Sequence, residues 1–170
     1  MRSAVIVTVP EAEPVVGGWR MQYTLDAPAG IPPHVTVLFP FVPSERVGDV
    51  EGRVAELVAA ASAFDILFAR TARFPEVLYL DPEPAQPFLA LTGAIAAEWP
   101  EHPPYEAAFE TVIPHLTVAE SDDPALLDRI AEDVEPQLPV ETRVREASLF
   151  VEDDNGRWHE HHRLPLAGQT

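Results

Sequence analysis

The chain has 170 residues, of which 46% are hydrophobic, and its formal net charge is −17 at pH 7. It contains no cysteine, and all 11 of its basic residues are arginine. These absences exclude disulfides, thiolate metal sites, cysteine nucleophiles and any mechanism through a lysine Schiff base or a lysyl-nucleotide intermediate. The negative charge repels phosphate backbones, so long RNA or DNA is not an expected partner.

The length suits one domain, or two small lobes that share a core. No apolar run is long enough to span a bilayer, and the amino-terminal residues lack the pattern of a signal peptide. We therefore expect a cytoplasmic monomer without membrane attachment.

Hydrophobic periodicity predicts alternating strands and helices along the chain. In order, the predicted elements are a strand at 3–9, a helix at 11–23, a strand at 35–41, a helix at 44–61, strands at 63–69 and 77–80, a helix at 87–99, a strand at 112–119, a helix at 123–134, and strands at 140–144, 147–152 and 157–166. Proline-rich or glycine-containing segments at 27–33, 100–105 and 153–156 separate them.

One short sequence motif occurs twice in this pattern. PPHVTVLF begins at Pro32, and IPHLTVA begins at Ile113. Each copy opens a strand, helix, strand, strand series, so we predict an α/β (α+β) fold. In this fold two duplicated units form mainly antiparallel sheets around a central cleft, related by a pseudo-two-fold axis. The whole chain, 1–170, is then one bilobal domain. Its lobes cover about 27–85 and 106–170, and the first strand and helix 87–99 pack between or across them.

The spacing of the polar residues in each copy gives them a common direction. Side chains at positions i and i+2 of a strand point to the same face. His34 and Thr36 therefore share one face, as do His115 and Thr117. The apolar residues between them face the helices, and the two polar faces line the cleft.

Two imidazoles and two hydroxyls suit phosphate ester chemistry. Histidine titrates near neutral pH, so one imidazole can take a proton from water while a protonated one gives a proton to the leaving oxygen. The threonine hydroxyls can hydrogen-bond the oxygens on which charge develops. This scheme needs neither a cofactor nor a metal. A single His-x-Thr on a strand is more often an ordinary polar pair, and only the duplication makes the pattern specific.

The paired motifs PHVTV and PHLTV resemble the HxTx motifs of the 2H phosphoesterase superfamily, in the branch labelled 2′-5′ RNA ligase family, whose relatives include cyclic phosphodiesterases. The segments FPEVLYLDP and PPYEAAFETVIPHLTVA extend the resemblance over most of the chain. It implies a hydrolase, metal-independent and without cofactors, that acts on 2′,3′-cyclic phosphate or 2′-5′ phosphodiester bonds and leaves a 2′-phosphate, with a role in RNA processing. Any ligase activity would be independent of ATP and would arise by reversal of the opening of the cyclic phosphate. His34, Thr36, His115 and Thr117 are the implied catalytic residues, with His115 as base and His34 as acid, although the pseudo-symmetry leaves the opposite assignment open.

Four other residues are candidates for substrate binding. Arg143 alternates with Thr142 and Val144 and could contact a phosphate, although pairing with a neighbouring acid is the favoured alternative. Tyr79, Tyr105 and Phe41 could stack on a base, although core packing is the favoured role for Phe41. The run at 159–162, HEHH, shows two histidines on one strand face but no third ligand, so no metal site is predicted.

The expected ligand is a small nucleotide or the cyclic phosphate at an RNA terminus. The main alternative is a non-catalytic module that binds a nucleotide or phosphate in the same cleft. A structural or protein-interaction role would follow only if the cleft were closed or filled by the protein's own side chains.

Overall fold

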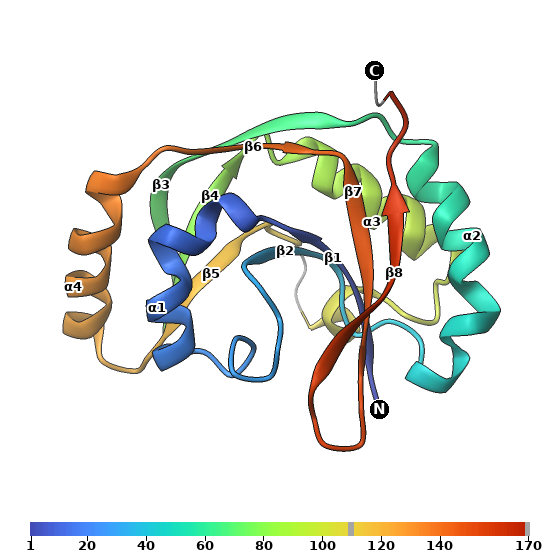
Figure 1. Cartoon of the computed structure of the whole chain (residues 1–170), viewed down its shortest axis with the longest axis horizontal. Coiled ribbons are helices and arrows are strands. Elements are labelled where there is room, and N and C mark those ends of the chain that lie inside the picture. Colours follow the sequence, from blue (N-terminus) through green and yellow to red (C-terminus); the bar gives the residue numbers. More distant parts are fainter. Residues whose placement is uncertain (109–110, 169–170) are drawn as a thin grey trace.

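Two four-stranded antiparallel sheets form the centre of the computed structural model, which describes residues 1–108 and 111–168 (Figure 1). The first sheet has the order β2-β1-β7-β8. Its strands are β1 (Ser3–Thr8), β2 (His34–Leu38), β7 (Glu146–Glu152) and β8 (Trp158–Pro165). The second sheet has the order β5-β4-β3-β6. Its strands are β3 (Phe64–Phe74), β4 (Val77–Glu83), β5 (Leu116–Glu120) and β6 (Val140–Val144).

Helices cover the outer side of each sheet. Helix α1 (Glu13–Tyr23) packs on β5, and α4 (Pro124–Val134) packs on β4 and β5. Helix α2 (Val47–Ala59) packs on β7 and β8, and α3 (Gln86–Glu98) packs on β2. Figure 1 shows the two pairs at opposite ends of the molecule, with the sheets between them. Short 3-10 segments complete the elements: η1 (Pro10–Ala12), η2 (Ser44–Arg46), η3 (Pro104–Ala107) and η4 (Glu135–Gln137).

The helices form where apolar residues recur at helical spacing. In α2 the buried residues are Val47, Val50, Val54 and Val58, which lie on one stripe. Helix α4 begins after Asp123, whose carboxylate accepts a hydrogen bond from the backbone N–H of Ala125 at 3.0 Å. This cap satisfies one of the free N–H groups of the first turn.

The predicted α/β class with two mainly antiparallel sheets is confirmed, and so is the equivalent place of the two motif strands. Each lies at the edge of its sheet, β2 next to β1 and β5 next to β4. The second motif strand is shorter than the predicted segment 112–119, because β5 begins only at Leu116. Residues 109–110 of the PPYEAAFETVIPHLTVA segment lie outside the described residues.

Strand pairing divides the chain differently from the contiguous lobes 27–85 and 106–170. Strands β3 and β4 follow the first motif in sequence but join the sheet of the second motif. Conversely, β7 and β8 follow the second motif but join the sheet of the first. This exchange places one main hydrophobic core across both sheets and all four α-helices. Among the described residues, no helix combines the length and apolar character needed to cross a membrane.

Candidate active site

The two motif strands alternate between core and cavity as their sequences predict. In β2, Val35 and Val37 are buried in the main core, whereas His34 and Thr36 line a cavity. In the second copy, Leu116 and Val118 are buried and Thr117 lines the same cavity. His115 also lines it, from the position just before β5.

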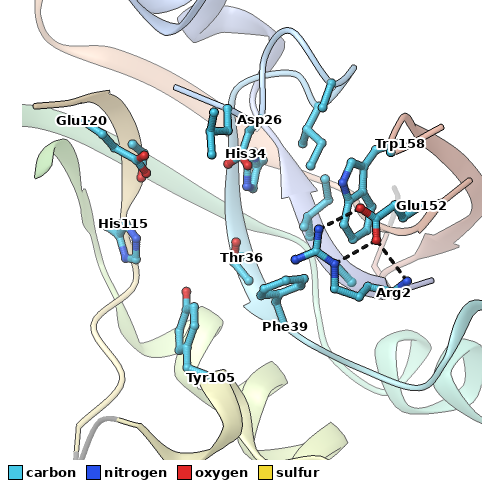
Figure 2. A pocket seen from close by; sticks show the side chains of 17 residues that line it. Arg2, Asp26, His34, Thr36, Phe39, Tyr105, His115, Glu120, Glu152 and Trp158 are labelled. Atoms are coloured by element: carbon cyan, nitrogen blue, oxygen red, sulfur yellow. Dashed lines mark hydrogen bonds and ion pairs between the residues drawn. The ribbon is translucent and has the colours of Figure 1, made fainter. Parts of the chain in front are cut away.

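The cavity that brings these groups together has a volume of about 520 Å³. It lies between the edge strands β2 and β5, which approach each other although they belong to different sheets. Figure 2 shows His34 and Thr36 on one side, with His115 and Tyr105 across from them. The predicted grouping of His34, Thr36, His115 and Thr117 around one cavity is therefore found.

Both imidazoles are oriented by the same backbone contact. Nδ1 of His34 lies 2.8 Å from the carbonyl oxygen of Pro32, and Nδ1 of His115 lies 2.7 Å from that of Ile113. In each case the acceptor belongs to the residue two positions earlier. A carbonyl can only accept, so Nδ1 carries the proton and donates it. This fixes one tautomer in both rings and leaves Nε2 of each for proton transfer.

The surroundings of His34 favour its neutral form. The residue is buried, with 8% of its surface exposed. Burial is the largest cause that lowers the pKa of His34, to about 4, and the positive charge of Arg20 adds to it. Asp26 acts in the opposite direction, and His115 lowers the pKa of His34 slightly further. His34 is thus unprotonated at neutral pH when the cavity holds no anion.

His115 lies in a less extreme environment. Its ring meets those of Phe74 and Tyr79 edge to face, with centroids 5.1 and 5.5 Å away. Burial lowers the pKa of His115, and the hydrogen bond to the Ile113 carbonyl partly opposes that change. Tyr79 therefore supports His115 from the side rather than lining the cavity as a stacking surface.

Tyr105 reaches the cavity from the segment after α3. Its backbone N–H donates to the carbonyl of Phe39 at 2.6 Å, which holds this segment against the first sheet. Burial raises the pKa of the Tyr105 phenol, and a hydrogen bond with Thr36 partly offsets that rise. The phenol is accordingly a neutral hydrogen-bonding group beside the first motif.

An aromatic wall extends the cavity away from the histidines. Phe39 and Trp158 meet edge to face, with centroids 6.0 Å apart, and Ile6 lies in the same small hydrophobic cluster. The Arg2 guanidinium lies 5.6 Å from the Phe39 centroid and 5.7 Å from the Trp158 centroid. Glu152 fixes that guanidinium through hydrogen bonds of 2.8 and 2.7 Å (Figure 2).

The loop before β2 is fitted closely against this wall. The backbone N–H of Trp158 donates to the carbonyl of Ala29 at 2.8 Å. Gly30 follows with a φ of +107°, and a Cβ there would lie 2.9 Å from the Trp158 carbonyl oxygen. Both the conformation and the close approach require glycine.

Two carboxylates, Asp26 and Glu120, line the part of the cavity beside the histidines. Burial, followed by the charge of Asp26, raises the pKa of Glu120, whereas Arg20 lowers it. Because Arg2 is paired with Glu152, the side chains that line the cavity carry a surplus of negative charge, which the buried charge of Arg20 reduces.

Of the four predicted binding residues, Tyr105 lines the cavity and Tyr79 lies behind His115, whereas Arg143 and Phe41 lie elsewhere. Arg143 pairs directly across β6 and β3 with Asp65, Nη1 to Oδ1 at 3.0 Å, and lines a separate groove. The alternative of pairing with a neighbouring acid therefore describes Arg143 correctly. Phe41 is buried in the main core, where its ring packs against those of Trp99 and His102.

Two histidines of the HEHH run contact carboxylates at hydrogen-bond distance instead. Nε2 of His159 lies 2.8 Å from Asp153, and Nε2 of His161 lies 2.6 Å from Glu51 on α2. In the described part of the chain, no group of three or more His, Cys, Asp or Glu side chains is arranged to hold a metal ion.

Sequence reasoning missed several residues that line the cavity, namely Arg2, Asp26, Phe39, Glu120, Glu152 and Trp158. Only Phe39 and Glu120 lie close to a motif in sequence, at the ends of the two motif strands. The aromatic and ionic wall is built by pairing β1 with β7 and β7 with β8, and no local pattern signals this pairing.

Comparison with known proteins identifies relatives of this arrangement. Residues 8–156 match the family model of the 2′-5′ RNA ligase superfamily. The crystal structure of TT0787 from Thermus thermophilus matches with a TM-score of 0.65 and 22% identity over 100% of both chains. Escherichia coli LigT matches over 98% of both chains, with a TM-score of 0.61 and 17% identity for its NADP+ complex and 0.59 and 16% for its 3′-AMP complex. At these identities the solved structures establish a shared fold. A search of curated proteins found no match.

Proposed function

Because the chain belongs to the 2′-5′ RNA ligase superfamily, we propose that it is a metal-independent phosphodiesterase of the 2H type. Its substrate is a 2′,3′-cyclic phosphate, or a related small cyclic or 2′-5′ phosphodiester, and its product is a 2′-phosphate. The observation that carries this proposal is the matched orientation of two histidines, each with Nδ1 bonded to the carbonyl two residues earlier and Nε2 left for the cavity.

The different surroundings of the two imidazoles suggest how they divide the chemistry. His34 has the lower tendency to hold a proton, since its pKa is lowered to about 4 by burial and by Arg20. It suits the role of base, whereas His115 suits the role of acid. This assignment is the reverse of the one suggested by family resemblance. It uses the alternative that pseudo-symmetry left open.

The reaction then proceeds by proton transfer without a covalent intermediate. Nε2 of His34 takes a proton from water as the water oxygen attacks phosphorus. The bond from phosphorus to the 3′ oxygen breaks, and Nε2–H of His115 gives its proton to that oxygen. The hydroxyls of Thr36 and Thr117 donate hydrogen bonds to the non-bridging oxygens, where charge increases in the transition state. The same step with the 5′-hydroxyl of a second RNA in place of water, the 3′ oxygen again leaving, gives a 2′-5′ bond and so ATP-independent ligation.

Charge and shape favour a small substrate. A cavity of about 520 Å³ is within the usual range for a small-molecule site. Phe39 and Trp158 offer an apolar wall on which a base can pack, and Tyr105 lies beside the reacting groups. The carboxylates oppose any further phosphate groups, so a mononucleotide fits better than a long RNA end. The LigT complexes with 3′-AMP and with ATP are consistent with a nucleotide ligand.

The test is hydrolysis of 2′,3′-cyclic nucleotides in the presence of EDTA, with 2′- and 3′-phosphate products separated. We expect 2′-phosphate from the unmodified protein. The variants His34→Asn and His115→Asn keep a side-chain donor near the position of Nδ1 but lose the basic nitrogen, so each should lose activity at least about 100-fold. Circular dichroism should show both variants folded.

Two results would contradict the proposal. Turnover that survives in both asparagine variants would mean that the histidines do not transfer the protons. Micromolar binding of the nucleotide without any product, in the folded protein, would instead favour a non-catalytic binding module.

A further inference from the structure

Arg20 is a charged side chain in the interior that the proposed reaction does not itself use. It lies on α1, and only 1% of its surface is exposed. Burial lowers the pKa of Arg20, while Asp26, Glu13 and Glu120 act to raise it. A guanidinium remains protonated even so. A permanent charge in the interior lowers the stability of the fold unless well-placed hydrogen bonds compensate for the loss of hydration.

The acceptors of this guanidinium are backbone carbonyls from both motif regions. Nη1 donates to the carbonyl of Thr117 on β5 at 2.9 Å. Nη2 donates to the carbonyl of Ile31 at 3.1 Å and, more weakly, to that of Pro32 at 3.4 Å. Thr117 belongs to the second motif, and Ile31 and Pro32 lead directly into the first. One planar group thus joins β5 of one sheet to the loop that leads into β2 of the other.

One of these acceptors also orients a histidine. The carbonyl of Pro32 receives the Nδ1 proton of His34 at 2.8 Å as well as the contact from Arg20. The same guanidinium is bonded to the main chain of Thr117, two residues after His115. The fork geometry of arginine sets the directions of its donors, so it constrains both segments together.

We propose that Arg20 is a positioning residue, which links the segment before His34 to the strand after His115 and so holds the two imidazoles in a fixed relative arrangement. This inference rests on the proposed two-histidine function. Efficient proton transfer needs donor and acceptor within hydrogen-bond reach of the substrate. Loss of the hydrogen bonds made by Arg20 therefore lowers the rate of the chemical step.

The charge of Arg20 has a second, electrostatic effect on His34. It lowers the pKa of His34, after burial and together with His115, while Asp26 raises it. The other titratable groups that line the same cavity near the histidines are Tyr105 and Glu120. Loss of the Arg20 charge should therefore move the protonation of His34 to higher pH.

The experiment compares Arg20→Met, which has similar length but no charge, with Arg20→Lys, which keeps the charge but loses the fork. Arg46→Met serves as the control, because Arg46 is exposed and pairs with Asp49 on the surface. For Arg20→Met we expect kcat to fall about tenfold or more while KM changes less than about threefold. The acidic limb of the rate profile should move to higher pH. Arg20→Lys should lose kcat but keep the acidic limb near its original position, and Arg46→Met should change neither.

A purely structural role would lower thermal stability and leave kcat and the pH profile of the folded protein unchanged. That result, in either folded Arg20 variant, would overturn the proposal. Two NMR measurements need no substrate and separate this proposal from the proposed reaction. In the unmodified protein the Arg20 guanidinium should show restricted rotation about its Nε–Cζ bond, and the His34 titration should shift upward in Arg20→Met. Free rotation of the guanidinium in the unmodified protein would overturn the link even if neither variant folds.

Discussion

His34 begins the edge strand β2 of one sheet, and His115 immediately precedes the edge strand β5 of the other. Each nevertheless donates its Nδ1 proton to the backbone carbonyl two residues earlier, at 2.8 Å for His34 and 2.7 Å for His115. The contact is local, so each motif orients its own ring. Their environments differ, because Arg20 and deeper burial act on His34. Matched orientation and unequal basicity are what a pair of groups needs to act as base and acid.

The dependence of rate on pH should reveal this inequality. The profile of kcat/KM reports the free protein, so its acidic limb should lie near the His34 pKa of about 4. Its alkaline limb should lie below the ordinary histidine pKa of about 6.5, because burial lowers the pKa of His115. A bound phosphate favours the imidazolium, so the alkaline limb of kcat should lie at higher pH. Rates from about pH 3 to about pH 9 would test this, and an acidic limb of kcat/KM near 6.5 would contradict the assignment.

Stability should also depend on the protonation of His34. Its pKa is lowered to about 4 on folding, so below about pH 6.5 the unfolded chain binds a proton that the folded protein does not. The free energy of unfolding should therefore fall as pH decreases from 6.5 towards 4, by about 2 kcal/mol between neutral pH and about pH 5 from this group. Urea denaturation at several pH values measures the fall. The variant His34→Asn should show a shallower decrease, and an equal decrease would exclude His34 as its source.

The pair formed by Arg2 and Glu152 should affect substrate binding rather than the chemical step. Arg2 lies against Phe39 and Trp158 and is fixed by two hydrogen bonds from its side chain to Glu152. In Arg2→Met the aromatic wall loses an internal cation–aromatic contact of about 1 kcal/mol, so the substrate has to order that wall itself on binding. We therefore expect KM to rise about fivefold with kcat changed less than about twofold. Glu152→Gln should act in the same direction by releasing the guanidinium. Steady-state kinetics on a 2′,3′-cyclic nucleotide would decide, and a large loss of kcat would place Arg2 in the chemistry instead.

The carboxylates of the cavity should select against substrates with additional phosphates. Burial is the largest cause of the raised pKa of Glu120, and repulsion from the nearby Asp26 adds to it. A 2′,3′-cyclic nucleotide that also carries a 5′-phosphate should therefore be hydrolysed with a lower kcat/KM than its unphosphorylated counterpart. In Glu120→Gln the ratio of the two values should move by about tenfold in favour of the phosphorylated substrate.

Glu132→Gln, an exposed change on α4, is the matched control for charge and should leave the ratio unaltered. A preference for the 5′-phosphorylated substrate in the unmodified protein would mean that these carboxylates do not oppose its extra charge.

Local sequence patterns were sufficient to predict which segments form strands and helices, although not all their bounds, and the direction of the motif side chains. The alternation of His34 and Thr36 with buried Val35 and Val37 follows from the two-residue period of a strand, which needs no knowledge of neighbours. The valines of α2 likewise mark one helical face. The duplicated motif then indicated a shared cavity because two equivalent strands were expected to face each other.

Tertiary structure decided which strands pair and which distant side chains meet. Strands β7 and β8 join the sheet of the first motif, and that pairing places Glu152 beside Arg2 and Trp158 beside Phe39. The pairing of β6 with β3 likewise places Arg143 opposite Asp65, so that Arg143 binds a carboxylate outside the cavity. A strand's own residues set its faces, but its partners depend on how every other strand is accommodated in the two sheets. The sequence alone thus determined which motif side chains line the cavity, and the pairing of distant strands decided what surrounds them.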